Sequence, residues 1–160
     1  MSSHTSRSAS ELSAAERAFY SRQLILPEMG YEAQLALKGA RVVVLGAGGL
    51  GAPALLYLAG AGVGQIVVVD DDVVDVSNLH RQVIHTHARV GNSKADSAAE
   101  SLRSLNPFIE VVPVRERLTE ANVDDLLSGA DLVLDGSDNF ESRYVVSAAA
   151  ARAGIPHVWA

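Results

Sequence analysis

The sequence contains no cysteine. This absence excludes disulfide bridges, a thiol nucleophile and thiolate metal ligands from the 160 residues. Long apolar runs are also missing, because Gly, Asp and Arg interrupt every hydrophobic stretch before the ~18 residues that a membrane span requires. The N-terminus has no apolar signal core, so we expect a cytoplasmic protein without a membrane partner.

Basic residues are scarcer than acidic ones, with 13 Lys and Arg against 19 Asp and Glu and a net charge of -6. This balance argues against a surface for nucleic acid or anionic lipid, so we expect no nucleic-acid partner. The apolar share of 48% and the charged share of 20% are ordinary for a globular protein. The length suits one domain with a hydrophobic core.

The stretch from residue 41 to residue 70 has the pattern of a nucleotide-binding unit. It contains, in order, a β-branched apolar run (41–45), three glycines with G-x-G-x-x-G spacing (Gly46, Gly48, Gly51), an apolar helix (about 49–61) and an apolar run that ends on Asp70 (66–70). Such glycines permit a tight turn, a close approach of phosphate and packing of the helix on the sheet. An acid at the end of the second strand can accept both hydroxyls of an adenosine ribose. The alternative is a glycine-rich turn without a ligand, and the pattern does not specify which nucleotide binds.

The remaining elements are predicted from periodicity and from start and stop signals. We expect further helices at about 14–21 (with a Ser13/Glu16 capping box), 31–37, 94–105, 119–127 and 140–153, and further strands at 109–114, 131–135 and 155–160. The alternation predicts an α/β fold, namely a Rossmann-like, doubly wound, mainly parallel sheet with an N-terminal helical extension.

The predicted organisation is a disordered tail (1–12), an N-terminal helical segment (13–40) and a nucleotide-binding Rossmann-like domain (41–160). The chain stops in or just after an apolar strand, so we expect a C-terminally truncated fragment of a longer protein. In parallel sheets ligands bind beyond the carboxyl ends of the strands. We therefore expect Gly46, Asp70 and residues 135–139 to converge on one crevice.

Two cations and an acid follow in the long polar connection from residue 71 to residue 91 and just after it. Arg81 and Lys94 can stabilise negative charge on a phosphate chain, and solvated surface charges are the alternative. Asp72 is expected on the same side as Asp70. We interpret the histidines of this connection (His80, His85, His87) as exposed, and Trp159 as a core residue.

Asp138 follows the strand at 131–135. Its carboxylate could hold Mg²⁺ together with phosphate oxygens, or it could cap the helix that begins near Asn139. The residues alone leave both roles open. Asp135 is expected to brace the loop between them.

With these residues in place, the chain resembles the ubiquitin-activating-like adenylyltransferases, and in particular the bacterial enzymes that activate sulfur-carrier proteins for molybdopterin and thiamine synthesis. The resemblance covers about residues 12–160. It rests on six motifs: Tyr20-Ser21-Arg22-Gln23, the glycine motif from Gly46 to Gly51, Asp70-Asp71-Asp72, Ser77-Asn78-Leu79-His80-Arg81-Gln82, Val90-Gly91-Asn92-Ser93-Lys94, and Asp135-Gly136-Ser137-Asp138-Asn139.

The resemblance implies a set of nucleotide contacts: Gly46, Gly48, Gly49, Gly51, Asp70, Asp72, Ser77, Asn78, Arg81, Lys94, Asp138 and Asn139. It implies that Asp138 coordinates Mg²⁺. It also implies catalytic roles for Arg22, Arg81, Lys94 and Asp138, with Arg22 acting on the ATP of the other subunit in a homodimer.

The reaction implied is attack by the C-terminal glycine carboxylate of a ubiquitin-like sulfur-carrier protein on ATP, giving an acyl-adenylate and pyrophosphate. Members of this family continue past the equivalent of residue 160, with structural zinc cysteines and much of the carrier-binding surface. We therefore expect this chain to be poorly active alone. The alternatives are an NAD-dependent oxidoreductase, which shares the glycines and the ribose acid, and a non-catalytic nucleotide-binding scaffold.

Overall fold

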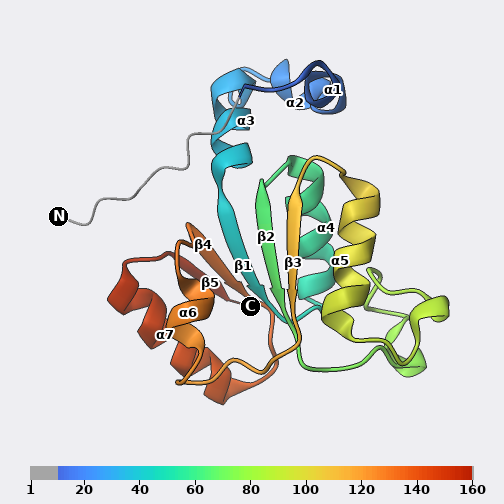
Figure 1. Ribbon diagram of the computed structural model, residues 1–160, viewed down its shortest axis with the longest axis vertical. Coiled ribbons are helices and arrows are strands. Elements are labelled where there is room, and N and C mark those ends of the chain that lie inside the picture. Colours follow the sequence, from blue (N-terminus) through green and yellow to red (C-terminus); the bar gives the residue numbers. More distant parts are fainter. Residues whose placement is uncertain (1–10, 160) are drawn as a thin grey trace.

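A computed structural model describes residues 11–159 (Figure 1). Most of the predicted tail lies outside the described residues, but its last residue does not belong to a tail. Leu12 is only 1% exposed, and its N–H donates to the Tyr31 hydroxyl at 3.2 Å. The predicted capping box is confirmed, because Ser13 and Glu16 each accept the other's backbone N–H.

The sheet has five parallel strands in the order β3-β2-β1-β4-β5. They are β1 (Arg41–Leu45), β2 (Gln65–Val69), β3 (Glu110–Val114), β4 (Leu132–Asp135) and β5 (His157–Trp159). The predicted Rossmann-like, doubly wound fold is confirmed. The strand order runs outward from β1 in both directions, so the topological switch point lies between β1 and β4.

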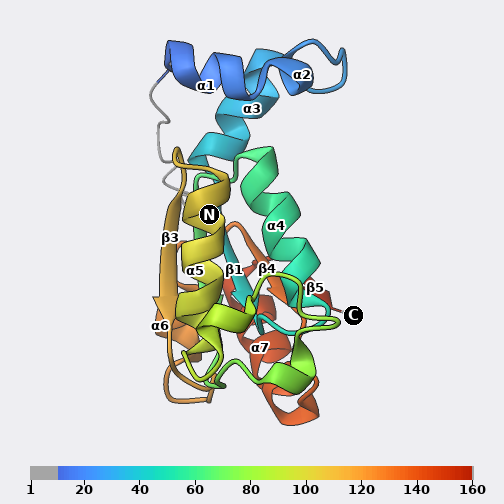
Figure 2. The same cartoon turned by 90° about the vertical axis from the view of Figure 1, so that its right-hand side faces the viewer.

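Four helices cover the two faces of the sheet. α4 (Gly51–Ala61) and α5 (Lys94–Leu105) pack with Val42 and Val44 of β1 on one face (Figure 2). α6 (Val123–Leu127) and α7 (Phe140–Ala153) pack with Val43 and Leu45 on the other face. Successive side chains of β1 thus belong alternately to two separate apolar clusters, as expected of a strand that is buried on both faces.

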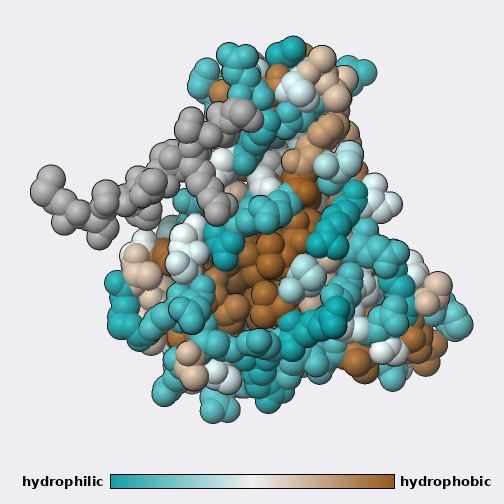
Figure 3. Space-filling model, in the orientation of Figure 1, coloured by the Kyte–Doolittle hydropathy of each residue, from teal (hydrophilic) through white to brown (hydrophobic). Residues whose placement is uncertain are grey.

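The second face is covered less completely than the first. Figure 3 shows apolar residues in the middle of the molecule, over the strands, between the N-terminal helices and the α6–α7 layer. Val112 and Val114 of β3, which belong to this face, are only half-buried.

The N-terminal helices α1 (Ala14–Phe19), α2 (Ser21–Leu24) and α3 (Gly30–Gly39) lie beyond the amino ends of the strands (Figures 1 and 2). Hydrogen bonds of buried side chains anchor them. Gln34 donates to the Ala61 carbonyl at the end of α4, and the Tyr20 hydroxyl accepts from Asn106 at the end of α5. The segment therefore sits at the end of the sheet opposite the carboxyl ends of the strands.

Several predicted boundaries differ from the structure. α4 begins at Gly51 rather than near residue 49. α6 begins at Val123 rather than Thr119, because the Asn122 side chain accepts the Thr119 N–H and holds a turn there. Trp159 is not a core residue; it is 61% exposed on the edge strand β5.

The connection from residue 71 to residue 91 is more ordered than its composition indicates. It contains two short 3₁₀ helices, η1 (Val76–Asn78) and η2 (His87–Arg89), and Val73 forms an antiparallel bridge with Ser93. No helix within residues 11–159 has both the length and the apolarity to cross a bilayer.

Candidate functional site

A cleft of about 500 Å³ opens where β1, β2 and β4 end. Its walls include the loop after β1 (residues 46–50), the acidic run after β2 (residues 70–72) and the loop after β4 (residues 136–139). The expected convergence of these strand ends is confirmed. The volume is within the range of small-molecule sites, and the position at the switch point is where open α/β sheets bind ligands.

The glycine loop forms the floor between the two walls. Gly46 has a positive φ of 85°, and its N–H donates to the Val69 carbonyl at 2.8 Å. A Cβ at Gly46 would lie 3.2 Å from the Gly136 carbonyl oxygen, so the loops after β1 and β4 touch. A Cβ at Gly48 would approach only the Gln82 amide nitrogen, at 3.7 Å, so the backbone at Gly48 is open to a ligand.

Asp70 accepts two backbone hydrogen bonds that fix its carboxylate. Its Oδ2 accepts the Ala47 N–H at 2.7 Å, and its Oδ1 accepts the Asp72 N–H at 2.9 Å. Burial raises the pKa of Asp70, while these hydrogen bonds and the charge of Lys94 act in the opposite direction. A carboxylate offers roughly four acceptor positions, so this group can still accept hydroxyls from the cleft.

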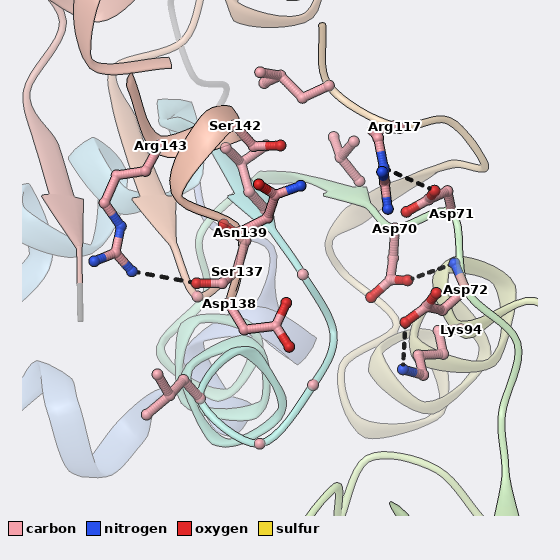
Figure 4. A pocket seen from close by; sticks show the side chains of 18 of the residues that line it. Asp70, Asp71, Asp72, Lys94, Arg117, Ser137, Asp138, Asn139, Ser142 and Arg143 are labelled. Atoms are coloured by element: carbon pink, nitrogen blue, oxygen red, sulfur yellow. Dashed lines mark hydrogen bonds and ion pairs between the residues drawn. The ribbon is translucent and has the colours of Figure 1, made fainter. Parts of the chain in front are cut away.

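Lys94 is not a solvated surface charge. Its side chain is only 8% exposed, and its ammonium group pairs with Asp72 at 2.9 Å on the wall of the cleft (Figure 4). Arg81 also lines the cleft, and its stem lies 3.8 Å from a Cβ built at Gly49. The structure therefore brings both predicted cations to the cleft, where Lys94 is buried and Arg81 is exposed.

Some of the predicted site residues lie outside the cleft lining. Gly51 begins α4, and Ser77 donates its hydroxyl to Asp75 at 2.6 Å. Asn78 accepts from the Arg81 guanidinium at 3.0 Å, so it contacts the cleft residue Arg81. Arg22 is exposed on α2, in the helical segment at the opposite end of the sheet.

Asp138 and Asn139 belong to the wall after β4. Of the two roles left open for Asp138, the helix cap is excluded, because Asn139 is the N-cap of α7 and accepts the Glu141 N–H at 3.0 Å. Asp138 is exposed on the cleft wall across from Asp70 (Figure 4). Asp135 is fully buried and accepts from the backbone and hydroxyl of Ser137, which confirms that it braces this loop.

The side chains of the cleft could hold a magnesium ion only if phosphate oxygens completed its coordination shell. Within residues 11–159 no group of three or more His, Asp or Glu side chains could hold a metal. Mg²⁺ in nucleotide sites takes one or two carboxylates and completes its shell with phosphate oxygens and water. Asp138 can supply such a carboxylate.

Sequence reasoning missed several residues of the cleft: Asp71, Gln82, Arg117 and Arg143. Arg117 pairs with Asp71 at 3.2 Å and lies three residues after the end of β3. Because ligands bind beyond the carboxyl ends of parallel strands, its position after β3 could have pointed to it. Arg143 donates to the Ser137 carbonyl at 3.2 Å, and its guanidinium carbon lies 4.8 Å from the centre of the Trp159 ring.

The prediction for the histidines is wrong at one position. His80 and His87 are exposed, but His85 is only 5% exposed. Its ring nitrogens lie 2.9 Å from the Ala47 carbonyl oxygen and 2.8 Å from the Ser97 hydroxyl. Burial lowers the pKa of His85, which favours a neutral ring.

Comparison with known proteins gives a family and several relatives. The profile of the ThiF family matches residues 20–160. The chain is 58% identical over 151 residues to the probable adenylyltransferase/sulfurtransferase MoeZ of Mycobacterium tuberculosis, covering 94% of this chain and 38% of that protein. It is 52% identical over 147 residues to the SAMP-activating enzyme E1 of Haloferax volcanii, covering 92% of this chain and 54% of that one.

Among solved structures, the chain is similar to the Escherichia coli tRNA N6-threonylcarbamoyladenosine dehydratase TcdA in complex with ATP. The TM-score is 0.88 at 32% identity, covering 94% of this chain and 61% of that one. The chain therefore spans between about one third and two thirds of the length of these three proteins.

Proposed function

The chain belongs to the ThiF family, and from that premise we propose that it is an adenylyltransferase that activates a ubiquitin-like sulfur-carrier protein. In this reaction a carboxylate oxygen of the carrier's C-terminal glycine attacks the α-phosphorus of ATP. The acyl-adenylate forms and pyrophosphate leaves. The product would supply molybdenum-cofactor or thiamine synthesis, and the names of the relatives from M. tuberculosis and H. volcanii support this class of reaction.

One observation carries the proposal: a single cleft joins a glycine loop, an acid for the ribose and two cations, with a further acid on the opposite wall. Asp70 accepts the ribose hydroxyls, and the backbone at Gly46, Gly48 and Gly49 admits the phosphates. Lys94 and Arg81 stabilise the charge that accumulates on the α-phosphate during attack. Asp138 holds Mg²⁺, which supplies further positive charge to the phosphate oxygens.

The remaining residues support these contacts. Asp72 pairs with Lys94 and orients its ammonium group toward the cleft. Ser77 and Asn78 form the turn that carries Arg81, and Asn78 holds the guanidinium directly. Gly51 lets α4 begin close under the loop, and Asn139 caps α7 so that Asp138 remains available to the ion.

The proposed enzyme is a homodimer in which Arg22 reaches the ATP of the partner subunit. Within one chain Arg22 lies on the helical segment at the end of the sheet opposite the cleft. The neighbouring Ile25 and Leu26 are 69% and 47% exposed, and exposed apolar groups of this kind are typical of a subunit contact.

Calorimetry with Mg²⁺–ATP and with NAD tests the nucleotide. We expect ATP to bind more tightly, because a dinucleotide needs neither Lys94 nor Asp138 beside its pyrophosphate. Tighter binding of NAD would contradict the proposal and support an oxidoreductase. Pyrophosphate–ATP exchange by the full-length protein tests the reaction, because the chain alone is expected to be poorly active. It should require a carrier that ends in glycine and should disappear with the same carrier shortened by that glycine.

A further inference from the structure

His85 lies in the connection after β2, and both of its ring nitrogens have partners. Nε2 is 2.9 Å from the Ala47 carbonyl oxygen, and Nδ1 is 2.8 Å from the Ser97 hydroxyl. A carbonyl oxygen can only accept, so Nε2 carries the proton and donates it. In the neutral ring Nδ1 is then an acceptor, and the Ser97 hydroxyl donates to it.

These two hydrogen bonds join two separate parts of the cleft. Ala47 belongs to the glycine loop after β1. Ser97 belongs to α5, whose first residue is Lys94, so Ser97 lies one turn along the same helix as the buried lysine of the cleft. His85 thus bridges the backbone of the loop and the helix that carries Lys94.

The bridge fixes the orientation of the backbone at Gly48. Asp70 accepts the N–H of Ala47, and His85 donates to the carbonyl of the same residue, so the peptide units on both sides of Ala47 are held. In a trans peptide the C=O and the following N–H point in opposite directions. Holding the Ala47 carbonyl therefore sets the direction of the N–H of Gly48, which lines the cleft.

We propose that His85 is a positioning residue that holds the glycine loop at a fixed position relative to α5. It thereby directs the Gly48 N–H and the Lys94 ammonium group toward the same phosphate chain. The inference rests on the proposed function, because it assumes that the cleft binds a nucleoside triphosphate. Replacing His85 should therefore lower the affinity for ligands that carry phosphates. It should leave the affinity for the nucleoside unchanged, because Asp70 still accepts the ribose hydroxyls.

The test compares ATP with adenosine by displacement calorimetry, using His85→Leu in the full chain. Leaving the buried Ala47 carbonyl without its donor should weaken ATP binding about tenfold. Adenosine binding should stay within about twofold of the wild-type value, because Asp70 keeps its own hydrogen bonds. The matched control is His87→Leu, two residues along, whose side chain is exposed and which should bind both ligands like the wild type.

Two further variants keep the test decisive if His85→Leu does not fold. In His85→Gln the amide can still donate to the Ala47 carbonyl, so part of the ATP affinity should return. In Ser97→Ala only the hydrogen bond between the Ser97 hydroxyl and Nδ1 of His85 is lost, and ATP binding should weaken about threefold. An equal loss of ATP and adenosine affinity in these variants would show a merely structural histidine and overturn the inference. Unchanged ATP affinity would overturn it as well. A wild-type chain that fails to bind ATP would instead contradict the proposed function itself.

Discussion

Gly51 and Gly46 are packed backbone to backbone: a Cβ added at Gly51 would lie 1.8 Å from the Gly46 carbonyl oxygen. No side chain can move aside to relieve such an overlap, because the contacting atom belongs to the loop itself. The third glycine of the motif therefore serves the packing of α4 under the loop, as the spacing predicted.

Gly51→Ala should destabilise the fold by about 3 kcal/mol, because the backbone of the loop or of α4 must shift to admit the methyl group. The same helix offers a matched control. A Cβ at Gly60 would meet nothing within 4 Å, so Gly60→Ala should stabilise the fold by up to about 1 kcal/mol through helix propensity. Urea unfolding of the two variants measures both values, and equal effects would contradict the packing role of Gly51.

The fold could be predicted because its signals are local. The run at 41–45, the glycines and Asp70 follow one another within a single βαβ unit, and the strand-end rule then located the cleft. Boundaries were less accurate where a side chain overrode the pattern, as Asn122 does at the start of α6. Trp159 was misplaced because hydrophobicity does not reveal that β5 is an edge strand of this sheet.

The site was predicted less completely because many residues that contact one another in it are distant in sequence. His85 contacts Ala47, 38 positions away, and Ser97, 12 positions away, and no local spacing encodes either contact. The pairing of Lys94 with Asp72 spans 22 positions and is equally invisible in the sequence. That Asp138 does not cap the following helix became clear only from the observed cap at Asn139.

Asp70→Ala should weaken ATP binding about tenfold to a hundredfold, because the variant loses a charged acceptor for the ribose hydroxyls. The loss should be specific for those hydroxyls. Wild-type protein should bind 2′,3′-dideoxy-ATP more weakly than ATP, whereas Asp70→Ala should bind the two alike. Calorimetry with both nucleotides measures this difference. If the variant still discriminates between them as the wild type does, Asp70 does not hold the ribose.

Asp138→Asn should remove most of the effect of Mg²⁺ on ATP affinity, about tenfold, because a neutral amide oxygen is a poorer ligand for a hard divalent cation than a carboxylate. ATP binding without Mg²⁺ should change little. Glu141→Gln is a suitable control, since Glu141 is an exposed acid in the first turn of α7 and is not part of this cleft wall. A full magnesium effect in Asp138→Asn would argue against metal ligation by this residue.

The stability of the protein should fall below pH 6.5 through His85. Burial lowers its pKa in the folded state, and the charges of Lys94 and Arg89 act in the same direction, while the Ala47 carbonyl and Asp70 oppose them. Below the ordinary pKa of about 6.5 the unfolded chain therefore binds a proton that the folded chain resists. The contribution of His85 to the free energy of unfolding is complete above pH 6.5. It is lost as the pH falls through the lowered pKa of His85 in the folded state.

Urea unfolding of wild type and His85→Gln from pH 7.5 to pH 5 measures the contribution of this histidine. The free energy of unfolding should decrease with falling pH more steeply in the wild type than in the variant, because glutamine does not titrate. Parallel curves for the two proteins would show that His85 does not resist protonation in the folded state.

Arg22 should act across the interface of the proposed dimer. In its own chain it lies on α2, at the end of the sheet away from the cleft, so any contact with a bound nucleotide would have to be with that of another subunit. An arginine inserted beside the phosphates would add a fixed positive charge where negative charge accumulates during attack. The alternative is that its charge only stabilises the carboxyl end of α2.

Mixing two inactive variants distinguishes these roles. In the full-length enzyme, Arg22→Ala and Lys94→Ala should each lose most pyrophosphate–ATP exchange as homodimers. After subunit exchange, a mixed dimer has one cleft with an intact Lys94 facing the intact Arg22 of the partner subunit, so partial activity should return. Arg22→Ala alone should unfold like the wild type, because the side chain is exposed. If exchange is demonstrated and the mixture remains as inactive as its parents, Arg22 does not serve the neighbouring cleft. The charge at the end of α2 would then be its only role.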